Sequence, residues 1–227
     1  VLCYGRPVAL ESIEPYFDAI IYSWHCGSET GNAVADILFG DVNPSGKLTA
    51  TMPRVVGQVP IYYNSGRVSM DVNGYYGLMY DTTTVRNYED CRSDPMYPFG
   101  YGLSYTEFEY SEPAADTKAI SLEEINRGEQ FIISVNIKNT GKTDGKETAQ
   151  CYIRDCCASM SRPIRELKDF KKVFIKAGKT VMVEFTLGKE ELAFYNANGE
   201  FCVEKGDFDV FVGKNCIDVQ KLKISVI

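Results

Sequence analysis

Residues 96–108, M-Y-P-F-G-Y-G-L-S-Y-T-E-F, constrain the fold of this chain more than any other stretch. Aromatic residues alternate with smaller ones, and Gly100 and Gly102 lie between the aromatic positions. Glycine permits a positive φ and a close backbone approach, both of which a Cβ hinders. The pattern predicts an extended segment with aromatic walls. A strand or crossover whose rings pack in a core is its simplest structural interpretation.

Composition changes across this stretch. Residues 1–117 hold one lysine, Lys47, and 13 of the 15 tyrosines, whereas residues 118–227 hold the other 14 lysines and two tyrosines. The first part has 6 basic and 15 acidic residues (−9) and the second has 18 and 16 (+2), which together give −7. A chain of 227 residues can form two domains, each with its own core. We therefore expect one domain over residues 1–117 and another over 118–227.

The first part has the rhythm of an α/β fold. Continuous apolar runs at residues 1–4 and 19–24 predict buried parallel strands. Apolar residues at helical spacing after Glu29 predict a helix with Ser28 as its N-cap and Gly40 as its C-terminal stop. Lone acids in the following loops, Asp94 among them, are expected to be solvated.

The second part alternates with a period of two, as half-buried strands do. Strands are expected at residues 131–137, 148–154, 170–175, 181–187, 201–204, 208–212 and 222–226. Seven strands with frequent turn signals in about 110 residues predict a β-sandwich of the immunoglobulin-like class.

A tyrosine-rich stretch, residues 65–95, has no clear periodicity. Loops of this length in a compact domain are usually functional or disordered, and the many aromatic residues argue against disorder. Flat rings stack on sugars and guanidinium groups bind hydroxyls, so we single out four residues as candidate substrate-binding groups: Tyr75, Tyr76, Arg86 and Tyr88. The alternative is that they pack this stretch against a neighbouring domain.

The totals exclude several classes of function. A net charge of −7 without a dense Lys/Arg run in the sequence argues against nucleic acid, and no apolar span of 18 residues predicts a membrane helix. His25 is the only histidine, so no His/Cys zinc site is expected, and no cofactor motif is present. Eight cysteines in a chain with complete apolar runs are expected to be free thiols, which favours a cytoplasmic location. The strand-like start suggests part of a longer protein, so export is not readable.

Several blocks of sequence resemble glycoside hydrolase family 3. The string Y-P-F-G-Y-G-L-S-Y-T is similar to the segment that, in this family, joins an α/β sandwich domain to a fibronectin type III-like domain. Further blocks similar to the family are G-R-P at 5–7, W-H-C-G-S-E-T-G-N-A-V-A-D-I-L-F-G-D-V-N-P-S-G-K-L at 24–48, Q-V-P-I-Y-Y-N at 58–64, V-N-I-K-N-T-G at 135–141, S-R-P-I-R-E-L-K-D-F-K-K at 161–172 and G-D-F-D-V-F-V-G at 206–213.

The resemblance implies a partial α/β sandwich domain followed by a fibronectin type III-like β-sandwich. It also implies part of a retaining, exo-acting β-glucosidase-type enzyme that removes terminal β-linked sugars. In the family the nucleophilic aspartate lies in a barrel domain and the acid/base glutamate lies upstream of the G-R-P strand. Neither is present, so no catalytic residue is expected in this chain, and the missing barrel could lie on either side. T-V-R-N-Y at 84–88 resembles the family's T-Y-R-Y-F, which supports Arg86 as a substrate ligand.

A second class of function stays open. The same two folds could form a non-catalytic carbohydrate-binding or domain-interaction module. Ser/His chemistry is disfavoured, because His25 has no G-x-S-x-G partner. The sugar preference, glucose, xylose or another, is not readable from these residues.

Overall fold

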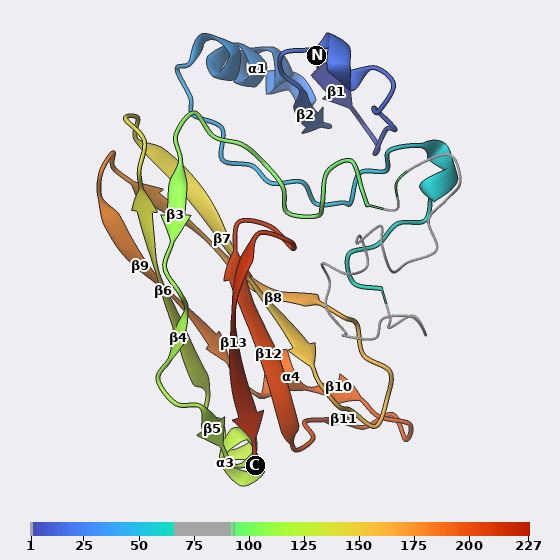
Figure 1. Cartoon of the computed structure of the whole chain (residues 1–227), viewed down its shortest axis with the longest axis vertical. Coiled ribbons are helices and arrows are strands. Elements are labelled where there is room, and N and C mark those ends of the chain that lie inside the picture. The colour runs from blue at the N-terminus through green and yellow to red at the C-terminus, as the bar shows by residue number, and fades with distance from the viewer. Residues whose placement is uncertain (1, 66–91, 93) are drawn as a thin grey trace.

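The computed structural model describes residues 2–65, 92 and 94–227, and shows two parts stacked along the long axis (Figure 1). The first part holds strands β1 (Leu2–Tyr4) and β2 (Ile21–Trp24) and helix α1 (Thr30–Phe39). It also holds three short 3-10 helices, η1 (Glu14–Tyr16), η2 (Gly27–Glu29) and η3 (Val56–Gln58). β1 and β2 pair in parallel, so the predicted α/β arrangement is confirmed.

Helix α1 ends as predicted and begins differently. Gly40 has a φ of +84°, and its N–H donates to the carbonyl of Ile37 at 3.1 Å. The predicted N-cap, Ser28, is wrong: it lies inside η2, and Glu29 occupies the cap position, where its side chain accepts no hydrogen bond from a backbone N–H of the helix. A 3-10 turn therefore leads directly into the helix and takes the place of a side-chain cap.

The first part leaves much of its apolar surface open. No residue of α1 is buried, and Phe39 at the end of the helix is 83% exposed. Two strands offer a helix little surface to pack on, since a stable α/β layer covers a wider sheet. This is what a portion of an α/β sandwich domain would show.

The second part is a β-sandwich of two sheets. One sheet has the order β5-β13-β12-β7-β8, and the other has the order β3-β6-β4, with β9 also paired to β6. The strands are β3 (Phe108–Tyr110), β4 (Ala114–Ala115), β5 (Ala119–Ile120), β6 (Phe131–Asn139), β7 (Gly145–Asp155), β8 (Glu166–Ile175), β9 (Thr180–Leu187), β12 (Gly206–Gly213) and β13 (Val219–Val226). Apart from the parallel β13–β5 pair, neighbouring strands in these sheets are antiparallel.

The strand set differs from the predicted seven, which did not include the short strands β3, β4, β5 and β10. The stretch predicted at 201–204 forms only β11 (Phe201–Cys202), which pairs with β10 (Phe194–Tyr195) outside both main sheets. Strands β3 and β4 precede residue 118 and pair with β6, so the end of residues 1–117 contributes to the sandwich. Their short length gave no clear alternation to read.

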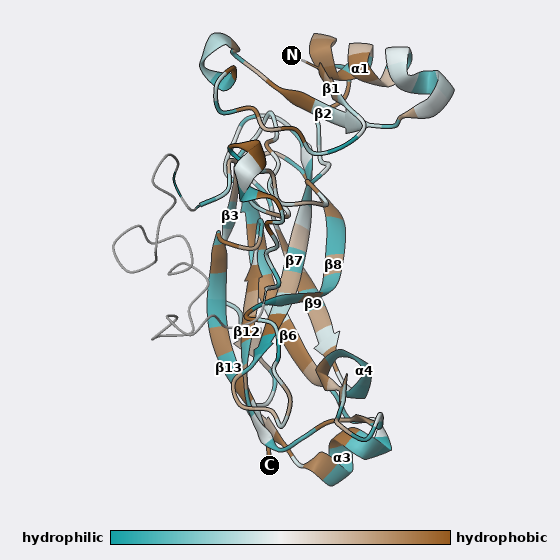
Figure 2. Ribbon diagram, turned by 90° about the vertical axis from the view of Figure 1, so that its right-hand side faces the viewer, coloured by the Kyte–Doolittle hydropathy of each residue, from teal (hydrophilic) through white to brown (hydrophobic). Residues whose placement is uncertain are grey.

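Two short helices lie at the far end of the sandwich, α3 (Leu122–Arg127) and α4 (Lys189–Leu192). Helix α3 begins with a capping box, in which Ser121 and Glu124 satisfy each other's backbone N–H groups. In Figure 2 they lie at the opposite end of the molecule from α1.

Burial along the strands shows which faces are covered. In β6, buried residues alternate with more exposed ones, because one face packs in the core between the sheets and the other faces solvent. In β7, residues 147–153 are all buried. Another part of the chain therefore covers the outer face of the five-stranded sheet at β7.

Candidate functional site

The cover on β7 is the stretch of residues 96–108, called here the linking segment. On the side of the first part, the N–H of Gly100 donates to the carbonyl of Leu48, and the N–H of Leu48 to that of Tyr101, both at 2.8 Å. On the side of the sandwich, the amide of Gln150 donates to the carbonyl of Gly100 at 3.1 Å. The linking segment is thus held between the two parts of the chain.

The glycines of the linking segment are required by this close approach. Gly100 has a φ of +80°, and a Cβ there would lie 2.1 Å from Oε1 of Gln150. A Cβ on Gly102 would lie 2.4 Å from the carbonyl oxygen of Gly46. The close approach predicted for both glycines, and the positive φ at Gly100, are confirmed.

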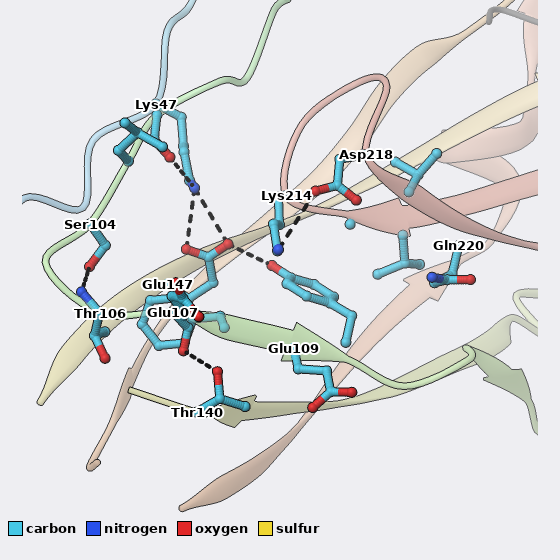
Figure 3. A pocket seen from close by; sticks show the side chains of 17 residues that line it. Lys47, Ser104, Thr106, Glu107, Glu109, Thr140, Glu147, Lys214, Asp218 and Gln220 are labelled. Carbon is cyan, nitrogen blue, oxygen red and sulfur yellow. Dashed lines mark hydrogen bonds and ion pairs between the residues drawn. The ribbon is translucent and has the colours of Figure 1, made fainter. Parts of the chain in front are cut away.

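A buried polar cluster lies beside the linking segment (Figure 3). Nζ of Lys47 lies 3.2 Å from Oε2 of Glu147 and also donates to the carbonyl of Gly102 at 3.1 Å. The hydroxyl of Tyr110 donates to Oε1 of Glu147 at 2.9 Å. Glu147 is 2% exposed, so this ion pair joins the two parts of the chain away from solvent.

The electrostatics of this cluster favour a structural role. Burial, followed by the nearby carboxylate of Glu147, raises the pKa of the Tyr110 hydroxyl and keeps it a proton donor. Both oxygens of Glu147 have a partner, and the charge of Lys47 balances that of the carboxylate. Glu147 is therefore poorly suited to act as a nucleophile. Sequence reasoning missed the cluster, although the single lysine in residues 1–117 was an available signal.

A cleft of about 710 Å³ opens next to this cluster. Three further carboxylates line it, Glu107, Glu109 and Asp218, and all three residues are exposed. In the described part of the chain, no group of three or more His, Cys, Asp or Glu residues could hold a metal ion. Among the described residues, the cleft is therefore lined by exposed carboxylates and by one buried glutamate that pairs with Lys47. Among those residues it has no pair of buried carboxyl groups.

A second cleft, of about 420 Å³, lies where the tyrosine-rich stretch begins, and Arg6, Tyr62 and Tyr63 are among its lining residues. The ring of Tyr63 stacks on Phe99 at a centroid distance of 4.1 Å. Burial raises the pKa of Tyr63, whose hydroxyl accepts a hydrogen bond from the N–H of Leu167 at 3.3 Å. This end of the stretch is thus fixed to the sandwich and to the linking segment.

The other end of the tyrosine-rich stretch is fixed to the first part. Nη2 of Arg54 lies 2.7 Å from Oδ2 of Asp94, and its Nη1 lies 3.1 Å from Oε1 of Glu11. The buried side chain of Gln58 donates to the carbonyl of Arg92 at 2.7 Å. The expectation that Asp94 is a solvated loop charge is wrong, because two arginines bind its carboxylate and leave its side chain 17% exposed.

The four predicted binding residues, Tyr75, Tyr76, Arg86 and Tyr88, lie outside the described residues. Their role stays a prediction. The structure does describe both flanks of the stretch that carries them, and each flank has its own anchor.

Comparisons with known proteins decide the family. The model of the glycosyl hydrolase family 3 C-terminal domain matches residues 1–105, and that of a fibronectin type III-like domain matches residues 147–216. The chain is the C-terminal part of a glycoside hydrolase family 3 protein. In the family's terms, β1, β2 and α1 belong to the C-terminal α/β domain, and the sandwich is the fibronectin type III-like domain.

Similar proteins of family 3 are considerably longer. A periplasmic β-glucosidase of Salmonella typhimurium is 41% identical over 97% of this chain and 28% of its own length. A β-xylosidase of Formosa agariphila is 38% identical over 94% of this chain and 27% of its own length. The crystal structure of a Listeria innocua β-glucosidase in complex with glucose matches with a TM-score of 0.87 and 38% identity, over 99% of this chain and 30% of that one.

Two further findings concern the helices and the cysteines. None of the helices in the described part of the chain combines the length and the apolar composition needed to cross a bilayer. No disulfide forms among the seven cysteines that the structure describes.

Proposed function

We propose that this chain is the C-terminal part of a retaining, exo-acting β-glycosidase of the β-glucosidase type. The enzyme would remove terminal β-linked sugars from oligosaccharides or glycosides. The observation that carries the proposal is that relatives named β-glucosidase and β-xylosidase align with nearly all of this chain, which spans only about 28% of their length. The nucleophile, the acid/base residue and the barrel domain would then lie outside these residues.

The chemistry of the described residues supports this division of roles. A retaining glycosidase uses two carboxyl groups about 5–5.5 Å apart, one of them as a nucleophile. Glu147 is the buried glutamate beside the larger cleft, and Lys47 and Tyr110 occupy its oxygens. The part described here would position other elements and would not perform the bond cleavage.

The tyrosine-rich stretch would contribute to substrate binding through Arg86, Tyr88, Tyr75 and Tyr76. Anchored flanks support this role, since a binding site needs its supporting residues fixed. The test is Arg86→Ala and Tyr88→Ala in the complete enzyme, with the exposed Tyr195→Ala as a control. We expect kcat/KM on an aryl β-glucoside to fall about 10-fold or more with an unchanged melting temperature. A lower melting temperature with normal turnover of the folded fraction would show that these residues only pack against a neighbour.

The alternative is a non-catalytic carbohydrate-binding or domain-interaction module. The exposed apolar residues of α1 are compatible with it, because they offer a surface to a partner as well as to the rest of an enzyme. Activity of the complete protein that depends on residues 1–227 would exclude this alternative.

We further propose a reducing compartment, with the cysteines as thiols. The absence of disulfides among the described cysteines supports it. The alternative is that the protein is exported, as the periplasmic location in the name of the Salmonella relative suggests. Thiol titration of the denatured chain without reductant should detect most of the eight cysteines. A result near zero would place the protein in an oxidising compartment.

A further inference from the structure

The sandwich carries a surface of one charge that the sequence does not show as a run. Residues 138–146 and 170–183 together contain seven lysines and one acidic residue, Asp144, in a chain of net charge −7. All seven lysines are exposed. This lysine surface consists of Lys138, Lys142, Lys146, Lys171, Lys172, Lys176 and Lys179.

Backbone contacts bring the two stretches together. The loop after β8, which crosses to β9 in the other sheet, meets the loop after β6, because the N–H of Gly178 donates to the carbonyl of Asn139 at 3.0 Å. The N–H of Ala177 also donates to Oδ1 of Asp144 at 2.8 Å, which occupies the one acid of the surface. In Figure 1 these loops lie at the upper left, where β6 and β8 end and β7 and β9 begin. The lysines thus gather at one corner of the sandwich.

The lysines form few internal charge contacts: Nζ of Lys171 lies 5.8 Å from the centroid of the Phe185 ring, and Lys138 is paired with Glu109 on β3. Among the described residues, none of the seven forms an ion pair with a carboxylate. Like charges held together repel one another, and neighbouring opposite charges would be the simple remedy. Their clustering in an acidic chain favours a ligand that carries negative charge.

Two exposed phenylalanines on β8 add an apolar component. Phe170 is 61% and Phe174 is 52% exposed, and Lys172 lies between them on the same face of the strand. With a rise of about 3.3 Å per residue, the two rings lie about 13 Å apart along a nearly straight line. Lys146 on β7 is paired with Phe174, so its side chain lies beside that ring.

We propose that the lysine surface, with Phe170 and Phe174, binds an acidic polysaccharide, a linear polymer of uronic acid residues. Such a polymer offers a carboxylate on each ring for the lysines and C–H faces for the phenylalanine rings. The alternation of ring, ammonium and ring along one extended strand matches a chain lying along β8. This binding is separate from hydrolysis and does not rest on the proposed function.

Two other polyanions fit less well. A lipid surface requires large apolar residues that can insert, and the loops that protrude, residues 139–144 and 176–179, hold none. Nucleic acid carries a dense phosphate charge, which a chain of net charge −7 would repel strongly. A polymer with one carboxylate per sugar has a lower charge density.

The test is affinity electrophoresis of the 227-residue chain in gels that contain polygalacturonate or a neutral β-glucan. We expect retardation by polygalacturonate alone, weakened by added salt. Lys146→Glu with Lys172→Glu should weaken binding about tenfold, and Phe170→Ser with Phe174→Ser should weaken it as well. The matched control is Lys118→Glu with Lys205→Glu, an equal charge change at exposed positions near the far end of the sandwich, which should alter binding less than about twofold.

Several results would overturn the proposal. Equal losses in the two lysine pairs would mean that only net charge matters, provided that melting temperatures show all variants to be folded. Absence of retardation, or tighter binding to anionic phospholipid vesicles or to DNA, would assign the surface to another partner or to none. Retardation of this chain that disappears in the complete enzyme would mean that another domain covers the surface.

Discussion

At the scale of single residues, the ion pair of Lys47 and Glu147 joins the two domains from within. Its side chains are 11% and 3% exposed, so removing one partner leaves a charge with little access to water. Lys47→Met or Glu147→Gln alone should lower the free energy of unfolding by about 3 kcal/mol, and the double variant should lose less than the sum. Urea unfolding measures this.

The exposed pair Lys223–Asp207 is the control for that cycle. Its side chains are 55% and 47% exposed, and removing Lys223 should change the free energy of unfolding far less than removing Lys47 does. Additive losses at Lys47 and Glu147 would show that the two residues stabilise the protein independently.

Tyr110 predicts how stability depends on alkaline pH. Burial and the carboxylate of Glu147 raise its pKa in the folded state, so above about pH 10 the unfolded chain loses this proton while the folded chain keeps it. The contribution of Tyr110 is complete below pH 10 and is lost as the pH rises further. Unfolding of Tyr110→Phe should therefore depend less steeply on pH between 10 and 11.5 than unfolding of the parent. The same slope in both proteins would contradict this, and the exposed Tyr195→Phe should keep the parent slope.

At the scale of elements, the sequence predicted a strand or a helix end correctly where one short stretch of residues determines it. Apolar runs predicted β1 and β2, Gly40 predicted the end of α1, and alternation predicted β6 and β9. The fibronectin type III-like and α/β assignments followed from these patterns together with the family resemblance.

Contacts between distant residues could not be read in the same way. Lys47 and Glu147 are 100 residues apart, and Arg54 and Asp94 are 40 apart, so no local period links them. Each looked like a lone charge, for which solvent is the default expectation. The lysine surface was missed for the same reason, because two loops that cross between the sheets bring its residues together. The capping box at Ser121 and Glu124 was readable and predicts α3.

The linking segment gives a prediction at this scale. Gly100→Ala must strain a positive φ and also place a Cβ against Gln150 and Tyr152, whereas Gly178→Ala, with a φ of +73°, meets nothing within 4 Å. Gly178→Ala should cost about 1 kcal/mol in the free energy of unfolding, and Gly100→Ala about 2 kcal/mol or more beyond that. Equal costs in thermal or urea unfolding would mean that the close approach of the linking segment to β7 is not a constraint.

At the scale of the whole molecule, we propose that the two domains and the linking segment support chemistry performed by residues outside this chain. The charge of the buried Glu147 is balanced by Lys47, and the other carboxylates that line the larger cleft are exposed. The flanks of the tyrosine-rich stretch are anchored to both domains. General acid–base assistance alone contributes about 10²–10⁴-fold to such reactions, and it needs placed groups.

The most direct test is the hydrolysis of an aryl β-glucoside by the purified chain of residues 1–227 and by the same chain restored to the complete family 3 enzyme. The chain alone should show no turnover above the buffer rate, and the complete enzyme should be active. Robust turnover by the chain alone, abolished by changing one of its own carboxylates such as Glu147→Gln without loss of folding, would contradict the account and place the active site within these residues.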